Sequence, residues 1–258
     1  MNALLSKLAV FGSSFAAIGV VWAGVQTALP DAQSAQVAFI GEAHAAEKAT
    51  IIPRPRLDAT EKGTRAIAIF AGGCFWGVEG VFEHTKGVIS AASGYHGGSK
   101  RSASYKLVSA GLTSHAEAVR VVYNPQQVSY GQLMQIFFSV VADPTMLNAQ
   151  GPDRGKHYRS ALVPMNAQQG KAARAYISQL SKGKYWRRPI VTKIESHKGF
   201  YYAEKYHQNF IQKNPRQAYI VRWDKPKIAN LKRHFPKNYR AKPVTQGGLD
   251  PVKDGYGQ

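Results

Sequence analysis

Short apolar runs, bounded by glycine, proline and asparagine, divide the first half of the central region into strands and a helix. Residues 65–71 (RAIAIFA) alternate and then become apolar throughout, which predicts a strand that ends at the glycines that follow. Apolar side chains on one side of 75–84 predict a helix. Two further runs predict strands at 88–92 and 118–123, and the Gly- and Ser-rich stretch 94–113 between them predicts a loop.

A second helix and a fourth strand follow. Ser129 is a favourable N-cap, and apolar residues from Leu133 to Val141 recur at helical spacing. Residues 142–158 predict an irregular loop, and 161–164 a short strand. The element order β-α-β-β-α-β predicts an α+β fold, a two-layer sandwich with a split β-α-β, ferredoxin-like core. Its mainly antiparallel sheet is covered on one face by two helices.

The pattern continues to about residue 222 and then changes. We expect a helix over 167–182, a strand near 190–195 and a short helix near 203–212, all within one folded domain that spans 65–222. Residues 223–258 are basic, rich in Pro and Gly, and poor in core-forming residues. This composition predicts a tail that wraps the surface or is disordered.

The N-terminal 45 residues have the composition of a targeting segment. Lys7 precedes an apolar run over 8–25, and Ala43-His44-Ala45 matches a cleavage site. The run approaches the length of about 18 residues that suggests a membrane span, so an uncleaved anchor is the alternative to a cleaved signal peptide over 1–45. Either interpretation predicts export to the periplasm or another extracytoplasmic space, with 46–64 as a linker to the folded domain.

The chain is strongly basic, with 34 Lys and Arg against 15 Asp and Glu and a net charge of +19. Such a charge favours anionic partners, including membrane surfaces, cell-wall polymers and acidic proteins. The basic residues are scattered, with mild clustering at 182–188 and 225–242, and the sequence contains no nucleic-acid-binding motif. We therefore expect a solvated basic surface, open to anionic surfaces and not to nucleic acid. We also expect a monomer.

Cys74 is the only cysteine of the chain, which excludes an intramolecular disulfide and a zinc site with several cysteine ligands. The histidines show neither i, i+4 spacing nor acidic companions, so we predict no metal. Cys74 precedes the predicted helix at 75–84, and a helix N-terminus lowers the pKa of a thiol. Phe75 and Trp76 would form an apolar wall beside it. The alternative is an inert cysteine buried among core aromatics.

Four polar residues are further candidates for chemistry. Glu117 begins a predicted strand, where alternation places it on the same sheet face as Val119. A carboxyl group on an apolar face has a raised pKa and can act as a general acid, whereas one at a strand edge in water is ordinary. Tyr95, Asp153 and Tyr158 lie among glycines in the predicted loops, where each taken alone fits an ordinary loop hydrogen-bonder.

Together, five sequence blocks resemble the peptide methionine sulfoxide reductase A family. They are GCFWG at 73–77, GYHGG at 94–98, SHAEAVRVVYNP at 114–125, DPTMLNAQGPDRGKHYRS at 143–160, and FYYAEKYHQNFIQKNP at 200–215. The resemblance covers about residues 65–222 and implies the family's α+β sandwich around a split β-α-β core. It also implies an enzyme that reduces methionine S-sulfoxide, free or in proteins, and so repairs oxidised proteins.

The resemblance implies a role for each candidate residue. Cys74 would attack the sulfoxide sulfur and become a sulfenic acid. Glu117 would protonate the departing oxygen. The other implied roles are hydrogen bonding to that oxygen by Tyr95 and Tyr158, contact with the substrate methyl group by Phe75 and Trp76, and ordering of the site by Asp153.

One departure from the family changes the expected recycling step. Many members carry resolving cysteines near the C-terminus, often just after an Asn-Pro and a Tyr like Asn214-Pro215 and Tyr219, but this chain has no second cysteine. The Cys74 sulfenic acid therefore requires an external thiol, either a small molecule or a thioredoxin-like or glutaredoxin-like protein, acting through a mixed disulfide. We expect no bound cofactor.

Two other functions fit parts of the sequence. A cysteine hydrolase would use Cys74 as its nucleophile with a histidine base such as His115 or His207. A non-catalytic basic binding protein would keep the same fold without turnover.

Overall fold

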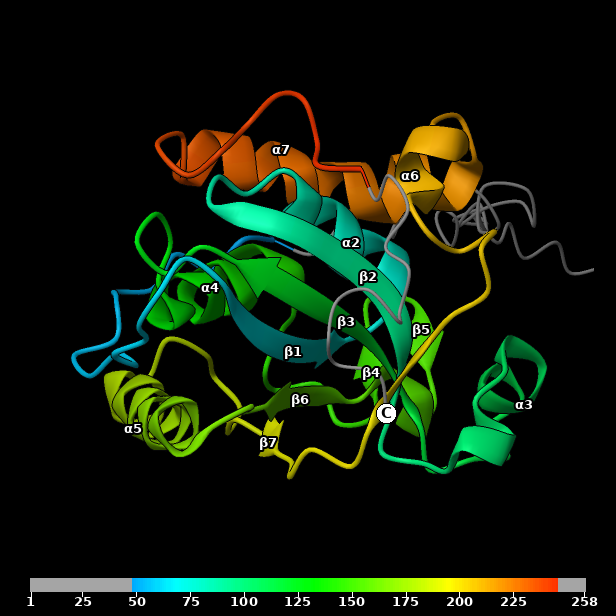
Figure 1. Cartoon of the computed structure of the whole chain (residues 1–258), viewed down its shortest axis with the longest axis horizontal. Helices are drawn as coiled ribbons and strands as arrows, with labels where there is room; N and C mark the ends of the chain where they lie inside the picture. Colours follow the sequence, from blue (N-terminus) through cyan, green and yellow to red (C-terminus); the bar gives the residue numbers. More distant parts are fainter. Residues whose placement is uncertain (1–47, 246–258) are drawn as a thin grey trace, which may run out of the picture. The chain divides into compact units, whose positions relative to one another are not determined.

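Residues 48–245 are described by a computed structural model, and their central feature is a six-stranded β-sheet (Figure 1). Neighbouring strands in this sheet are antiparallel, except for β6 and β7, which are parallel. The central order β6-β1-β3-β2 is that of a split β-α-β core, which confirms the predicted fold. In sheet order the strands are β7 (Lys193–Ile194), β6 (Ser160–Val163), β1 (Ala66–Gly72), β3 (Ala116–Tyr123), β2 (Val88–His96) and β8 (Phe200–Tyr202).

Two helices follow the central strands and cover one face of the sheet. α2 (Phe75–Glu83) joins β1 to β2, and α4 (Tyr130–Ile136), continued by the π-helical turn η2 (Phe137–Val141), follows β3. Ser129 caps α4 as predicted, because its hydroxyl accepts from the Gln132 N–H at 3.1 Å. In return, the Gln132 side chain accepts from the Ser129 N–H at 3.2 Å.

The main core lies between this sheet face and the helices. Phe70 of β1 is buried against Phe82 of α2 and Phe137 of η2, with ring centroids 4.8 and 5.3 Å apart. Alternate residues of β1, such as Ile69, belong to a smaller apolar cluster on the other face. A shift of one residue would exchange the two sets, so burial fixes the strand register. α5 (Ala167–Gly183) packs on the main core as well.

Several elements differ in length from their sequence predictions. β2 continues to His96, because it pairs with β3 along its length and with β8 at its end. The predicted loop 94–113 therefore begins in a strand, and it also contains the short helices η1 (Lys100–Ser102) and α3 (Tyr105–Ser109). Two other elements are shorter than predicted: β7 stands in place of 190–195, and α6 (Phe210–Lys213) in place of 203–212.

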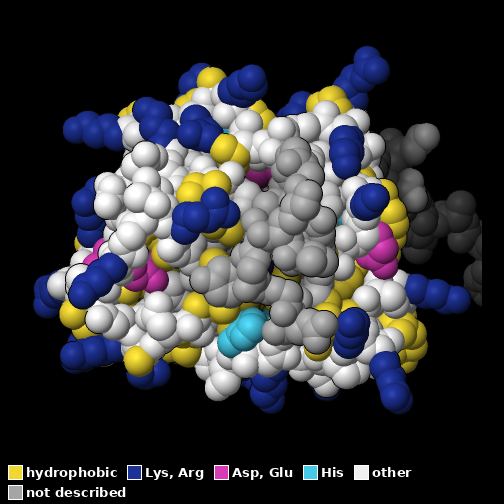
Figure 2. Space-filling model, in the orientation of Figure 1, with side chains coloured by type: hydrophobic (Ala, Val, Ile, Leu, Met, Phe, Trp, Pro, Cys, Tyr) yellow, Lys and Arg dark blue, Asp and Glu magenta, His cyan; other side chains and the backbone are white. Residues whose placement is uncertain are grey.

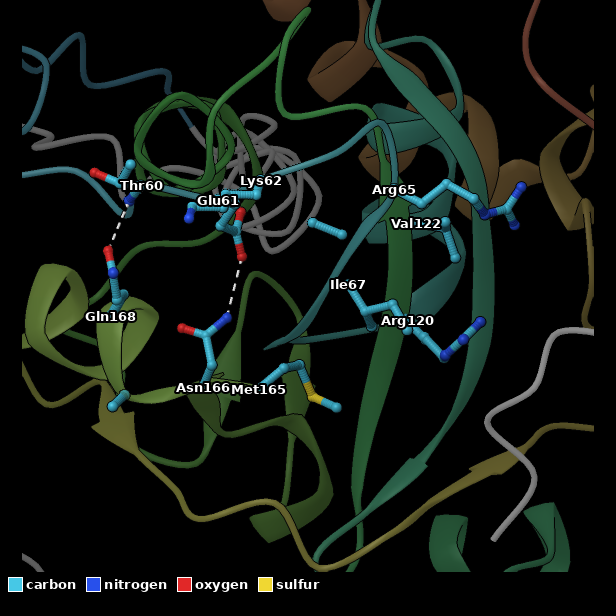
Figure 3. A pocket seen from close by; sticks show the side chains of 12 residues that line it. Thr60, Glu61, Lys62, Arg65, Ile67, Arg120, Val122, Met165, Asn166 and Gln168 are labelled. Carbon is cyan, nitrogen blue, oxygen red and sulfur yellow. Dashed lines mark hydrogen bonds between the residues drawn. The ribbon is translucent and has the colours of Figure 1, made fainter.

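The predicted linker, 46–64, is attached to the domain over part of its length. The Thr60 N–H donates to the Gln168 side chain at 3.0 Å, and the Glu61 carboxylate accepts from the Asn166 side chain at 3.2 Å (Figure 3). Both partners lie at the start of α5. These contacts make residues 60–61 part of the folded surface.

The first part of the predicted tail, 223–258, lies on the domain surface and is not disordered, but it forms a helix that the composition did not predict. Residues 225–234 form helix α7 (Lys225–His234), which packs on α2 and buries Leu231 (Figure 1). Beyond this helix, the Val244 N–H donates to the Glu83 carbonyl at 3.0 Å. Lysine and arginine dominate the composition, but Ile228 and Leu231 lie three residues apart on one helix face, which permits docking. Residues 246–258 lie outside the described part of the chain.

The face of the molecule seen in Figure 2 is basic, and its Lys and Arg side chains do not gather in one patch. Figure 2 shows Lys and Arg side chains spread around the visible face, in line with their scattered positions in the sequence. The predicted signal peptide or anchor, 1–45, lies outside the described residues. Between residues 48 and 245, no helix combines the length and the apolar character needed to cross a membrane.

Candidate active site

Cys74 lies at the junction of β1 and α2, in the N-cap position predicted for it. The chain turns sharply here: Gly73 has a φ of +85°, and a Cβ on it would lie 2.5 Å from the Gln150 side chain. A Cβ on Gly72 would lie 2.6 Å from the Phe137 ring. Both glycines are therefore required for β1 to deliver Cys74 to the helix tip. The cysteine is 7% exposed.

A cavity of about 220 Å³ opens beside Cys74. Six of the seven residues predicted for the site line it, and they come from the turn that holds Cys74 and from α2, β3 and two later short elements. The structure therefore brings together side chains that are as far as 84 residues apart in the sequence, from Cys74 to Tyr158. The complete lining is Cys74, Phe75, Trp76, Tyr105, Glu117, Asp153, Tyr158 and Tyr219.

Glu117 is buried at the start of β3, with 2% of its surface exposed. One carboxylate oxygen accepts from the Phe75 N–H, in the first turn of α2, at 3.0 Å. Burial raises the pKa of Glu117 to about 8, and the nearby Asp153 and Asp224 carboxylates act in the same direction against the Phe75 hydrogen bond. The side chain therefore carries a proton at neutral pH, as a general acid requires.

The environment of the Cys74 thiol differs from the sequence prediction. Burial raises its pKa well above the ordinary value, and the carboxylates of Asp224, Glu117 and Asp153 add to this effect. A hydrogen bond from the Trp76 N–H opposes it, which is the contribution expected at a helix N-terminus. Desolvation outweighs the helix, so the resting sulfur is a neutral thiol and not the predicted thiolate.

The lining residues outside α2 and β3 come from short elements. Tyr158 ends the turn η3 (Lys156–Tyr158), and Asp153 belongs to β5 (Asp153–Arg154), which pairs with β4 (Ala149–Gln150). The Tyr219 hydroxyl donates to the Asp153 carboxylate at 2.5 Å and so fixes its orientation.

Tyr105 is the first residue of α3 and completes this set of lining residues. Burial raises its pKa to about 12, with the Glu117 carboxylate and the Cys74 sulfur contributing in that order. Its hydroxyl therefore keeps its proton and faces the two candidate reactive groups as a hydrogen-bond donor.

The prediction that Tyr95 reaches the substrate oxygen is wrong. Tyr95 lies in β2, opposite Glu117 in register, but its side chain is fully buried outside the cavity lining. Its hydroxyl donates to the Glu204 carboxylate at 2.8 Å. The extension of β2 explains the error, because Tyr95 belongs to a strand and not to a loop. Tyr105, ten residues later in the same predicted loop, occupies the position expected of Tyr95.

The apolar wall is held by aromatic contacts. The Trp76 ring is stacked on Phe210 with 3.7 Å between centroids and 4° between planes. Its N–H donates to His207 Nδ1 at 3.0 Å, and Tyr219 meets its face edge-on at 6.0 Å. The indole is therefore fixed in both position and rotation, next to Phe75.

Three residues of the site region were absent from the sequence predictions of site residues: Tyr105, Tyr219 and Asp224. Tyr105 follows Ser104, a possible helix cap, and Tyr219 follows the Asn-Pro pair of the last family-like block. These are the signals that the sequence offers for them. Asp224, which is buried near Cys74, lies in the segment whose composition predicted a tail.

A second hollow, of about 570 Å³, lies away from this site (Figure 3). It is lined by residues such as Arg65, Ile67, Arg120 and Met165, and it contains no predicted site residue. Its position at the start of β1 separates it from Cys74, which follows the end of that strand.

The histidines required by a cysteine hydrolase are engaged elsewhere. His207 Nδ1 accepts the Trp76 N–H, and His115 Nδ1 accepts the Gly98 N–H at 3.2 Å. The lining of the Cys74 cavity within residues 48–245 includes no histidine. In the same part of the chain, no group of three or more His, Cys, Asp or Glu side chains is arranged to hold a metal ion.

Comparison with known proteins places these features in a family. A sequence model described as "Peptide methionine sulfoxide reductase" matches residues 66–239, which extends past the predicted domain end at 222. "Peptide methionine sulfoxide reductase MsrA 2" of Mesorhizobium japonicum is 56% identical over 177 residues, covering 69% of this chain and 91% of that protein. A protein of the same name from Synechocystis sp. is 43% identical over 196 residues, covering 74% and 91%.

Two solved structures share the fold. Mxr1 from Saccharomyces cerevisiae in reduced form has a TM-score of 0.53 at 33% identity, covering 62% of this chain and 92% of its own. Methionine sulfoxide reductase A of Corynebacterium diphtheriae has a TM-score of 0.52 at 30% identity, covering 67% and 90%. The family match spans every residue that lines the Cys74 cavity. The chain belongs to the peptide methionine sulfoxide reductase family, as its sequence blocks predicted.

Proposed function

We propose that this protein reduces methionine S-sulfoxide, free or in proteins, to methionine, with Cys74 as the nucleophile and Glu117 as the proton donor. The observation that carries the proposal is the convergence of a thiol, a protonated carboxyl, two tyrosine hydroxyls and an apolar wall on one small cavity. A sulfoxide has a nucleophile-accepting sulfur, a basic oxygen and an apolar methyl group. The cavity offers a complementary group for each.

The substrate would bind with its methyl group against Phe75 and Trp76. The fixed orientation of the indole gives this contact a defined shape, which supports selection of one sulfoxide epimer. The oxygen would then point towards Tyr105, Tyr158 and Glu117, each of which can donate a hydrogen bond in its protonated state.

The net reaction transfers one oxygen atom and two electrons. The Cys74 sulfur attacks the sulfoxide sulfur, Glu117 protonates the oxygen, and the S–O bond of the substrate breaks as oxygen passes to Cys74. The substrate sulfur is reduced to the thioether of methionine, and Cys74 is oxidised to a sulfenic acid. Glu117 gives its own proton to the oxygen and takes up the proton of the Cys74 thiol. The net result is that one proton leaves the Cys74 sulfur and one is bound to the sulfenic oxygen.

Recycling of Cys74 would depend on a second molecule. A sulfenic acid condenses with a thiol to form a disulfide and water, and this chain has no other cysteine to provide that thiol. An external thiol would therefore form a mixed disulfide with Cys74, and a second external thiol would release it. Small thiols and thioredoxin-like or glutaredoxin-like proteins all have the required chemistry.

The proposed place of action is outside the cytoplasm. The support is the apolar run over 8–25 and the small residues at 43–45, which match a signal peptide or an anchor. The mass of the protein purified from its own cells tests this directly. Export with cleavage predicts a chain that begins near residue 46, whereas a full-length chain in the cytoplasmic fraction contradicts the proposal.

Intact-mass measurement tests the chemistry. Purified protein is mixed with methionine S-sulfoxide without reductant, and we expect one equivalent of methionine and one added oxygen atom on Cys74. Added thiol should reverse the mass change and restart turnover. Cys74→Ser is the control that should show neither effect, and methionine R-sulfoxide should react far more slowly. An unchanged mass with no methionine formed contradicts the proposal.

A further inference from the structure

We propose that Glu204 is a positioning residue that holds Tyr105 in the active site, with Tyr95 as the partner that fixes Glu204 in turn. The proposal rests on the proposed function, because it concerns how the site presents a hydroxyl group to the sulfoxide oxygen. It gives Tyr95, which does not reach the cavity, an indirect part in the reaction.

The two carboxylate oxygens of Glu204 each serve a different donor. One accepts from the Tyr105 backbone N–H at 2.9 Å, and the other accepts from the Tyr95 hydroxyl at 2.8 Å. Tyr95 is fully buried in β2, so its hydroxyl is a fixed point within the core. The carboxylate therefore connects the rigid sheet to the first residue of α3.

Tyr105 depends on such a connection because α3 has only five residues and follows a long loop. A single turn of helix has little stability of its own. The Tyr105 N–H lies at the start of this turn, where a backbone donor lacks a partner within the helix. The hydrogen bond to Glu204 supplies this partner and sets the point from which the Tyr105 side chain enters the cavity.

The segment that carries Glu204 is itself anchored to the sheet edge. Gln208 accepts from the Ser93 N–H at 3.1 Å, and its amide donates to the Ser93 and Ala203 carbonyls, both at 2.9 Å. We name residues 203–208 the strap. The strap follows β8, which pairs with the end of β2, so it cannot move independently of that strand.

The same strap also supports the apolar wall. His207 accepts the Trp76 N–H, and its ring lies 4.3 Å from that of Tyr105, between centroids. One short segment therefore contacts both a tyrosine and a tryptophan of the cavity lining. Within the strap, Glu204 is the residue whose side chain bonds to Tyr105 directly, whereas His207 bonds to Trp76.

The test measures the rate of Cys74 oxidation in a single turnover with free methionine sulfoxide, which requires no reductant. Glu204→Ala should lower the saturated rate constant about tenfold, the effect expected from the loss of one hydrogen bond to the reacting oxygen. The half-saturating sulfoxide concentration should change less than threefold. Glu204→Gln should retain most of the rate, because the amide oxygen can accept from Tyr105 while the amide N–H donates to the Tyr95 hydroxyl.

A double-mutant cycle separates positioning from general damage to the fold. If Glu204 acts through Tyr105, Glu204→Ala should have less than a twofold effect when Tyr105→Phe is already present. Tyr95→Phe should reproduce a smaller part of the Glu204→Ala defect and should also lose its effect beside Tyr105→Phe. Fully additive losses, or equal losses in Glu204→Ala and Glu204→Gln, overturn the proposal.

The matched control is Lys205→Ala, because Lys205 is exposed and adjacent to Glu204 in the strap. It should leave the rate and the melting temperature unchanged. Failure of the proposed function is distinguishable from failure of this inference. If the wild-type protein forms no methionine, the proposed function is refuted. If wild-type turnover is normal and the Glu204→Ala variant is unaffected, only the role of Glu204 is refuted.

Discussion

The two sides of the Cys74 cavity differ in construction. One side, here called the core wall, consists of Cys74, Phe75, Trp76 and Glu117, and it comes from α2 and β3, which belong to the main core. The other side, the loop wall, comes from α3, β5, η3 and the residue before η4 (Ile220–Asp224), each no longer than five residues. The loop-wall residues are Tyr105, Asp153, Tyr158 and Tyr219.

This difference separates two tasks. In the proposed reaction, the core wall holds the groups that exchange electrons and protons, and the fold itself fixes their mutual geometry through the Phe75 N–H bond to Glu117. The loop wall holds hydroxyl groups that bind and orient, and these depend on side-chain hydrogen bonds between short segments. Changes in the core wall should therefore alter the chemical step most, and changes in the loop wall should have smaller, partly compensated effects.

The largest expected effect is that of Glu117→Gln in the core wall. The amide cannot protonate the sulfoxide oxygen, so the single-turnover rate constant at pH 7 should fall about 10²- to 10⁴-fold. Methionine formation measured by rapid quench checks this. A loss smaller than tenfold would mean that the loop-wall hydroxyls carry the proton, which would erase the proposed division of tasks.

The pH profile of the wild-type protein sharpens the same point. Glu117 has a pKa of about 8, and its protonated form is the active one in the proposed reaction. The acid-catalysed rate should therefore be lost as the pH rises through 8, by about tenfold per unit beyond it. Glu117→Gln should lack this decline. A wild-type profile that stays level to pH 10 would contradict the role of Glu117 as the acid.

In the loop wall, Tyr105→Phe and Tyr158→Phe should each lower the single-turnover rate about tenfold, since each removes one hydrogen bond to the oxygen. The double variant should lose more than either single one. Tyr219→Phe, which removes only the bond to Asp153, should cost about threefold. An effect of any single loop-wall variant as large as that of Glu117→Gln would break the comparison between the walls.

The smallest effect on activity, but a measurable one on stability, is expected for Glu83→Gln. Burial and the neighbouring Glu79 carboxylate raise the pKa of Glu83 in the folded protein. The folded state is therefore favoured while Glu83 is protonated, and this stability is lost as the pH rises through the folded-state pKa. The variant should melt a few degrees above the wild type at pH 9 and at the same temperature at pH 5, with unchanged turnover. Thermal unfolding at both pH values measures this, and equal melting temperatures at pH 9 would refute it.

The core wall was predictable from the sequence because its signals are local. The strand, glycine pair and helix around Cys74 are consecutive, and Glu117 follows from the alternation of β3. The resemblance to a family added Asp153 and Tyr158, which lie in a segment without periodicity.

The remaining features depend on contacts between distant segments. Composition predicts a loop at Tyr95, but pairing of β2 with β3 and β8 extends the strand and turns this residue into the core. Tyr105 is held at the site by a hydrogen bond to Glu204, which lies 99 residues later in the sequence. Asp224 is brought to the site by the packing of α7 on α2. The neutral state of Cys74 is likewise a product of burial, which outweighs the local helix contribution. None of these contacts leaves a periodic trace in the sequence.

The 7% exposure of Cys74 and its neutral state affect how fast its thiol reacts with oxidants other than a sulfoxide. Peroxide and alkylating agents react with exposed thiolates, so we expect a buried, protonated thiol to react with them slowly. In the proposed reaction, the sulfoxide itself brings the oxygen that Glu117 would protonate, so we expect Cys74 to attack only when this substrate is bound. Low reactivity with other oxidants would keep the lone cysteine reduced between turnovers.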